Sequence, residues 1–414
     1  MVILEIAAGL ITLAALFSYI NYKYIKLPMT IGLMIFSLAL SLLIIFANLV
    51  FPGVQKYVEN IIAEVDFNIT LMHGMLAFLL FAGALHVDFN DLQKRKIEVG
   101  ILSTFGVLLS TVIVGGLIFA LSNIFNLQLE FIHCLLFGAL ISPTDPIAVV
   151  GIFKQVGAPK TLEIKLKGES LFNDGIGVVV FLVILSIAFP VDGHSDNGIM
   201  SALQLFVVEA IGGILFGFIF GWIAYQMLKS VDNYSVEILI TLALVIGGFT
   251  LANHLHTSGP LAIVVAGLLI GNQGRQYAMS EKTREHLDTF WELIDEILNA
   301  LLFVLIGLEV LIVSLTGQHL LAGLIAIPLV LFSRFISVGI PISVMRLRKS
   351  YTNHVVKIMT WGGLRGGISV ALALSLPPGP QRDVILTITY TVVTFSIIVQ
   401  GLTLKYLIGK STEE

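Results

Sequence analysis

The stretch FGALISPTDPIAVVGIF, residues 137–153, is apolar enough for a membrane helix, but Pro143 and Pro146 interrupt it near its middle. A proline inside a helix removes a backbone hydrogen bond and clashes with the preceding turn, so the helix breaks there. Broken backbone at membrane depth is tolerated only where it is buried in protein or lines a cavity. The stretch therefore predicts a membrane-embedded site around Thr144 and Asp145, which lie between the two prolines.

The composition of the whole chain is that of a membrane protein. Of its 414 residues, 57% are hydrophobic and only 12% are charged, and the mean hydropathy is +0.97. Charged, proline-rich or polar breaks divide the chain into thirteen apolar segments, most of them near or above the ~20 residues that cross a bilayer as a helix. We expect an all-α polytopic membrane protein with thirteen transmembrane helices. The segments are 2–21, 28–51, 69–87, 98–125, 131–153, 162–189, 201–228, 235–255, 259–273, 287–315, 319–346, 354–376 and 383–408.

Several other functions find no support in the sequence. The first segment lacks the basic flank and cleavage site of a signal peptide, so we expect it to remain as a span. The single Cys134 cannot form an internal disulfide, and the nine histidines lack metal-ligand spacing. We therefore expect no cofactor, no resident metal ion and no nucleic-acid partner.

Most of the 23 basic residues fall in alternate loops, from Lys23 and Lys26 in the first to Arg346 in the eleventh, whereas only Lys56 and Arg382 lie in loops on the other side. Basic loops of membrane proteins face the cytoplasm. This places the N-terminus outside the cell and the C-terminus in the cytoplasm. Two arginines remain inside segments, Arg334 and Arg365, and intramembrane arginines usually pair with acids or carbonyls.

A second interruption lies in the twelfth segment, TWGGLRGGISVALALSLP, at 360–377. The residues of this break are Gly362, Gly363, Arg365, Gly366 and Gly367. If segments 1–6 and 8–13 form two halves, the fifth and twelfth segments correspond, and the single segment between the halves inverts the second. Two interrupted helices in matching positions of inverted repeats indicate a transporter's binding site. At the crossing, Asp145 can compensate the partial positive charge of the half-helix N-termini, and Arg365 can compensate the partial negative charge of the half-helix C-termini.

The sixth segment carries polar residues in its first half, ESLFND at 169–174. At 100° per residue, Ser170 and Asp174 stack on one helix face, whereas Glu169 and Asn173 form a second column. One column can point at an ion and the other at a neighbouring helix. Carboxylate, hydroxyl and main-chain oxygens suit a hard monovalent cation. Burial raises the pKa of a carboxylic acid, so a proton and a cation can compete for one pair of oxygens, and in an alternating-access site such competition is exchange.

Five motifs carry a resemblance to a known family. They are SPTDP at 142–146, ESLFND at 169–174, LFSRFISV at 331–338, WGGLRGGISVAL at 361–372 and VQGLTL at 399–404. In this order they resemble motifs of the monovalent cation:proton antiporter family, the sodium/proton exchangers, and the short tail resembles the prokaryotic type. The resemblance implies a secondary transporter in the cell (inner) membrane, not an enzyme. Its substrates would be H⁺ and Na⁺, with Li⁺ or K⁺ as alternatives.

The resemblance also implies the ion site. Asp174 resembles the aspartate that binds the transported Na⁺ and the proton, with Asn173 as its partner. Ser170 and Thr144 resemble additional ligands, and Thr144 with Asp145 resembles the family's pair at the crossing of the broken helices. An N-cap of the second half of the fifth segment is an equally good role for Asp145.

Glu169 resembles the acid that pairs with an arginine of the eleventh segment, here Arg334. The family implies a homodimer in which 1–88 and 235–315 form the dimerisation scaffold and 98–189 and 319–408 the ion-transporting core. Residues 201–228 would link the halves, and 409–414 would form a short cytoplasmic tail. Some relatives carry a further acid in the third span, but MLAFLLFAGALHV at 75–87 offers none.

Two other functions can be weighed against exchange. Asp145 and Asp174 could form the dyad of an intramembrane aspartyl protease, but their contexts, Thr-Asp-Pro and Asn-Asp-Gly, differ from the signatures of such enzymes. A cation channel is the other alternative. Because Asn173 stands beside Asp174, only one of the pair can titrate, and we expect electroneutral exchange of one cation for one proton.

Overall fold

The computed structural model describes residues 2–63, 70–87, 93–146, 149, 151–153, 160–189, 199–311, 316–347 and 354–412, and every element in these ranges is helical. The longer helices are α1 (Val2–Ile20), α2 (Met29–Val50), α7 (Lys96–Phe125), α10 (Lys160–Ala188), α11 (Ile199–Lys229), α12 (Tyr234–His254), α15 (Glu281–Glu309), α16 (Gly317–Met345) and α19 (Pro380–Phe395). The shorter ones are α3 (Val54–Ala63), α5 (Leu76–Leu85), α8 (Phe131–Ile141), α13 (Gly259–Leu269), α14 (Arg275–Tyr277), α17 (Val355–Trp361), α18 (Gly367–Leu374) and α20 (Gly401–Thr412). Short π-helical turns are η1 (Asn21–Ile25), η2 (Thr70–Met75), η3 (Ile270–Gly274) and η4 (Ser396–Gln400).

The predicted all-α class is confirmed, and each predicted apolar segment overlaps a helix. Among the described residues, 8 helices are long and apolar enough to cross a membrane, and the apolar helices Leu76–Leu85 and Phe131–Ile141 are shorter. The count of thirteen spans stays a prediction. Helix α15 begins at Glu281, earlier than the predicted 287, because the Ser280 hydroxyl caps its first turn by accepting a hydrogen bond from the Thr283 amide.

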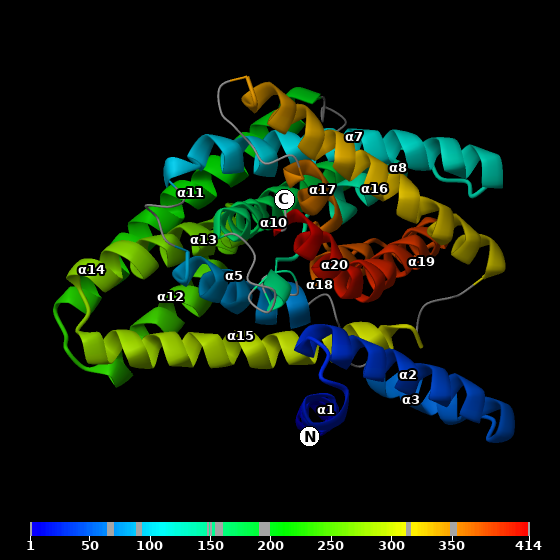
Figure 1. The fold of residues 1–414 in the computed structure, drawn as a ribbon, viewed down its shortest axis with the longest axis horizontal. Helices are drawn as coiled ribbons and strands as arrows, with labels where there is room; N and C mark the ends of the chain where they lie inside the picture. Colours follow the sequence, from blue (N-terminus) through cyan, green and yellow to red (C-terminus); the bar gives the residue numbers. More distant parts are fainter. Residues whose placement is uncertain are drawn as a thin grey trace.

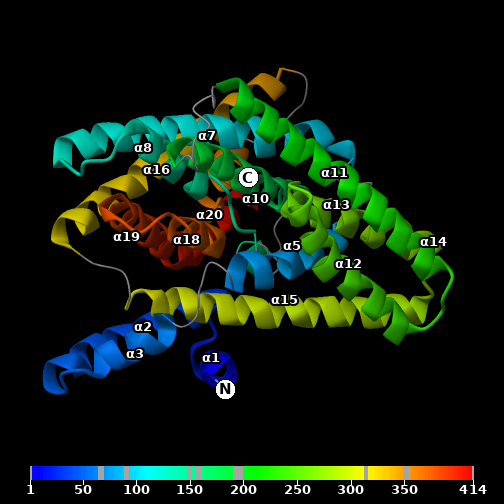
Figure 2. The ribbon, with the colours of Figure 1, turned by 180° about the vertical axis from the view of Figure 1, so that it is seen from behind.

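The helices pack in two groups (Figures 1 and 2). In one group α7 packs against α8, α10 and α16, and α18 packs against α8 and α19. In the other group α13 packs against α5, α11 and α12. Helix α15 runs along the edge of the molecule, where it packs against α5 and α12 and against α2 of the N-terminal helices. Two residues of the predicted site, Asp145 and Asp174, line a cavity between the two groups.

The two interrupted helices meet at their breaks. Helix α8 ends at Ile141, just before Pro143, and α17 and α18 are separated by the residues Gly362–Gly366. The backbone N–H of Asp145 donates to the carbonyl of Leu364 at 2.8 Å, so each broken segment satisfies a backbone group of the other. This contact fixes the crossing point beside the first half of α10, which packs against both α8 and α18.

Candidate functional site

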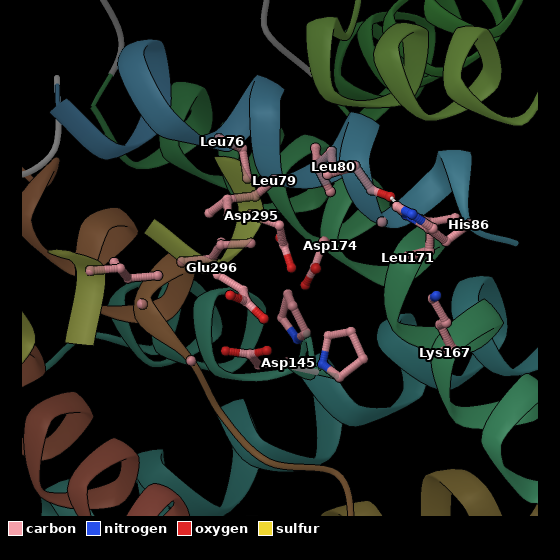
Figure 3. Close-up of a pocket in the computed structure, with 18 of the residues that line it drawn as sticks. Leu76, Leu79, Leu80, His86, Asp145, Lys167, Leu171, Asp174, Asp295 and Glu296 are labelled. Carbon is pink, nitrogen blue, oxygen red and sulfur yellow. Dashed lines mark hydrogen bonds between the residues drawn. The ribbon is translucent and has the colours of Figure 1, made fainter. Parts of the chain in front are cut away.

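A cavity of about 340 Å³ lies where the two groups of helices face each other. Residues of α5, α10, α15 and α18 and of the break after α8 line it (Figure 3). Its acidic lining residues are Asp145, Asp174, Glu292, Asp295 and Glu296, and Lys167 and His86 also border it. Carboxylates outnumber the basic groups around this cavity, which gives it the charge to attract cations and repel anions.

Asp174 extends from α10 into this cavity, although the residue as a whole is only 7% exposed. The neighbouring Gly175 allows α13 to approach closely behind it, since a Cβ at this position would lie 2.6 Å from the Leu261 side chain. Close packing on that face fixes the position of α10. The site therefore presents one carboxylate of α10 to the cavity from a tightly packed helix.

The other predicted ligands form a buried cluster around Thr144. The Thr144 hydroxyl accepts from the Asn173 amide nitrogen at 2.9 Å and shares a hydrogen bond with the Ser170 hydroxyl at 3.0 Å. The Thr144 N–H donates to the Asn173 side-chain oxygen at 3.2 Å. Both polar columns of α10 thus meet on one residue of the break. The residues that line the cavity in the described part of the chain include Asp174 but not this trio.

Asp145 and Arg365 hold the crossing from opposite sides. The Arg365 guanidinium donates to the carbonyls of Ser142 at 2.5 Å and Pro143 at 2.9 Å, which the break leaves without helical partners. The Asp145 carboxylate lies against the backbone of Gly366, where any Cβ would overlap it, just before α18 begins. A carboxylate near a helix N-terminus is stabilised by the helix dipole. The N-cap role predicted for Asp145 concerns a half-helix that lies mostly outside the described residues.

Glu169 points away from Asp174, toward α16. Its two carboxylate oxygens accept hydrogen bonds from the Arg334 guanidinium at 2.6 and 2.9 Å, and the two residues are 0% and 4% exposed. The arrangement is bidentate, which is the strong geometry for an arginine and a carboxylate. Gly363 packs on the same guanidinium, since a Cβ there would lie 2.7 Å from the Arg334 Nε. The ion pair therefore joins α10, α16 and the break between α17 and α18.

The sequence prediction did not include the acids of α15. Glu292, Asp295 and Glu296 all line the cavity, and Figure 3 shows the carboxylate of Asp295 directed toward that of Asp174. Their spacing of three and four residues places them on one helix face. The predicted segment 287–315 contains five acids, and these three at helical spacing could have been recognised as a functional signal.

The comparisons with known proteins agree with this arrangement. The family model described as "Sodium/hydrogen exchanger, transmembrane" matches residues 11–410. The Na(+)/H(+) antiporter NhaP of Pseudomonas aeruginosa is 50% identical over 98% of this chain and 96% of its own length. The Na(+)/H(+) antiporter NhaH of Halobacillus dabanensis is 36% identical over 94% of this chain and 93% of its own length.

A solved structure shares the fold. The sodium proton antiporter MjNhaP1 of Methanocaldococcus jannaschii aligns over 100% of both chains with a TM-score of 0.75, at 20% sequence identity. The predicted antiporter fold, with its crossed and interrupted helices, is therefore confirmed, and the motif resemblance is borne out by the sequence relatives over nearly the full chain. The chain belongs to the sodium/hydrogen exchanger family of membrane transporters.

Proposed function

We propose that this chain exchanges Na⁺ for H⁺ across the membrane and that Asp174 binds the two in turn. The observation that carries the proposal is the position of Asp174, a nearly buried carboxylate that faces a cavity beside two crossed, interrupted helices. Either a cation or a proton neutralises such a carboxylate, and the neutralised carboxylate can then pass through an apolar barrier with its bound ion. Competition for one group then couples the two movements.

The Thr144 cluster supports a site for a small hard cation. Ser170, Asn173 and Thr144 satisfy one another by hydrogen bonds, so their oxygens are held in place before an ion arrives. Asn173 directly precedes Asp174 in the chain, and Ser170 lies one helical turn before it. We propose that these groups and Asp145 complete the coordination when Na⁺ binds. The relatives are named as Na(+)/H(+) antiporters, which favours Na⁺ over K⁺ as the physiological ion.

The ion pair and the break residues would have structural roles. Glu169 and Arg334 would lock α10 to α16, and Arg365 would hold the end of α8, so neither arginine needs to change its protonation during transport. Because one carboxylate then carries either ion, the exchange would be electroneutral, one Na⁺ for one H⁺.

We further propose the architecture that the family resemblance implied. Residues 98–189 and 319–408 would move as the core, and 1–88 with 235–315 would form the scaffold of a homodimer in the inner membrane. The packing of α7 against α8, α10 and α16, and of α18 against α8 and α10, supports this division. With the N-terminus outside, the cavity of this structure would open to the cytoplasm, because Lys167 near the start of α10 and His86 after the end of α5 border it.

The test is transport by the purified chain in proteoliposomes that contain a pH-sensitive dye. Addition of Na⁺ to vesicles with an acidic interior should raise the internal pH, and K⁺ at the same concentration should not. Asp174→Asn should abolish the response in a protein that still elutes as a folded species, and Asp174→Glu should retain part of it with altered Na⁺ affinity. Substantial exchange by Asp174→Asn at saturating Na⁺ would refute the assignment, and single-channel currents would point to a channel instead.

A further inference from the structure

We propose that Asp295 of α15 is a second cation-binding carboxylate, which shares Na⁺ or H⁺ with Asp174 only while the cavity is open to the side seen in this structure. The inference rests on the proposed exchange function and adds a residue that sequence motifs do not identify. Because Asp295 would contribute to binding on one side only, the affinity of the transporter for Na⁺ would differ between the two sides of the membrane.

The position of Asp295 within α15 matches that of Asp174 within α10. Helix α10 begins at Lys160 and α15 at Glu281, so each carboxylate lies at about the same distance, roughly 21 Å of helix, from the start of its own helix. The two residues line one cavity, and their carboxylates are directed toward one another (Figure 3). A cation between them would be neutralised from both sides.

The side chain of Trp291 fixes the rotation of α15 that brings Asp295 into the cavity. Trp291 lies one helical turn before Asp295 and is fully buried. Its ring packs against Phe81 of α5, with ring centroids 4.6 Å apart, and its Nε1 donates to the Thr241 hydroxyl of α12 at 3.1 Å. These contacts anchor the face of α15 that carries Asp295 against α5.

Asn299 lies one turn further along α15, on the same side of the helix as Asp295. Its Oδ1 is buried without a hydrogen-bond partner, and the residue is 3% exposed. The Asn299 oxygen is therefore one further acceptor next to Asp295. By contrast, Glu292 and Glu296 are exposed at their positions on the same face.

The dependence on conformation follows from which helices carry the two acids. Asp174 belongs to α10, whose neighbours include α7 and α8, whereas Asp295 belongs to α15, which packs against α2, α5 and α12. In the proposed alternating-access cycle, α10 moves with α7 and α8 relative to α15 and its neighbours α2, α5 and α12. Asp295 then stays behind when Asp174 turns to the other side, and its charge contributes to ion binding on one side only.

The experiment measures Na⁺ dependence separately at each face. In everted vesicles, where the cytoplasmic face is outside, Asp295→Asn should raise the half-maximal Na⁺ concentration about tenfold, the effect of losing one charged ligand. In right-side-out vesicles the half-maximal Na⁺ concentration should change less than twofold. Asp295→Glu should restore most of the cytoplasmic affinity.

The matched control is Glu285→Gln, which removes the same charge from an exposed position of α15 outside the cavity and should alter neither face. An equal shift at both faces, no shift at all, or a loss that Asp295→Glu does not restore would overturn the proposal. Failure of the proposed exchange function itself would be seen separately, because the wild-type chain would then show no Na⁺-dependent proton movement in either preparation.

Discussion

At the scale of single residues, the hydroxyl of Thr144 connects the broken helix to α10. It is the common partner of Ser170 and Asn173, and all three residues are nearly fully buried. A buried donor left without its partner costs about 1–3 kcal/mol. Because Ser170 and Asn173 belong to the same turns of α10 as Asp174, a change in this cluster should affect both folding stability and ion binding.

The variant Thr144→Val keeps the shape of the side chain but removes the oxygen. We expect it to lower the free energy of unfolding by about 1–3 kcal/mol and to raise the Na⁺ concentration for half-maximal exchange. Thr144→Ser keeps the hydroxyl and serves as the control, with most of the affinity retained. Melting curves and Na⁺ titrations of the two variants measure both effects. Equal behaviour of Val and Ser variants would show that the hydroxyl is not needed.

The residue scale also shows what the motifs could not predict. Helical spacing correctly places Ser170 and Asn173 in different columns of α10. Both nevertheless contact Thr144, because the break places Thr144 within reach of both columns. Helix periodicity describes one element and carries no information about a non-helical segment that crosses it. Ser170, Asn173 and Thr144 were identifiable from the sequence, but the contact of both columns with Thr144 was not.

At the scale of elements, the bidentate contact between Glu169 and Arg334 joins α10 to α16 inside the fold. Breaking one partner of a buried ion pair costs about 3–5 kcal/mol, because the other charge is left uncompensated, whereas removal of both is much less harmful. Glu169→Ala and Arg334→Ala should each lower thermal stability markedly. The double variant should lose clearly less than the sum of the two single losses.

A thermal double-mutant cycle on the purified protein measures this coupling. Glu163→Ala, at a half-buried position near the start of the same α10, is the control and should have a small effect. Strictly additive losses would mean that the two side chains contribute independently and that another contact holds α10 to α16.

The breaks were predictable at this scale, and the role of α15 was not. Pro143 and the glycines at 362–367 alter backbone chemistry directly, so the positions where α8 ends and α18 begins follow from residue type alone. Which face of α15 meets the cavity depends instead on how Trp291 packs against Phe81, a contact between distant segments. The acids of that segment could be seen in the sequence, but which of them line the cavity could not.

At the scale of the whole molecule, the proposed stoichiometry decides which gradient can drive transport. A net charge moved would couple to the membrane potential by ~2.3 kcal/mol per 100 mV, whereas a neutral cycle responds only to the pH difference, ~1.36 kcal/mol per unit. In proteoliposomes at equal pH, a potential set by K⁺ and valinomycin should cause no Na⁺ uptake, and a one-unit pH difference should support a Na⁺ ratio of about tenfold.

The control for this prediction is a demonstration that the chain does not transport K⁺ itself. Accumulation of Na⁺ driven by the potential would contradict one-for-one exchange. It would indicate that a second group releases its proton during the cycle, and Asp145, Asp295 and Glu169 would be the first residues to substitute.

The claim that Na⁺ and H⁺ compete for Asp174 is tested most directly by proton release on ion binding. Na⁺ is added to the purified protein in a weakly buffered solution at a pH where the site is protonated, and released protons are counted with a pH dye. The account predicts release that saturates with Na⁺ near one proton per chain and is absent in Asp174→Asn, with choline chloride producing none. Na⁺ binding without proton release, or undiminished release by Asp174→Asn, would contradict it.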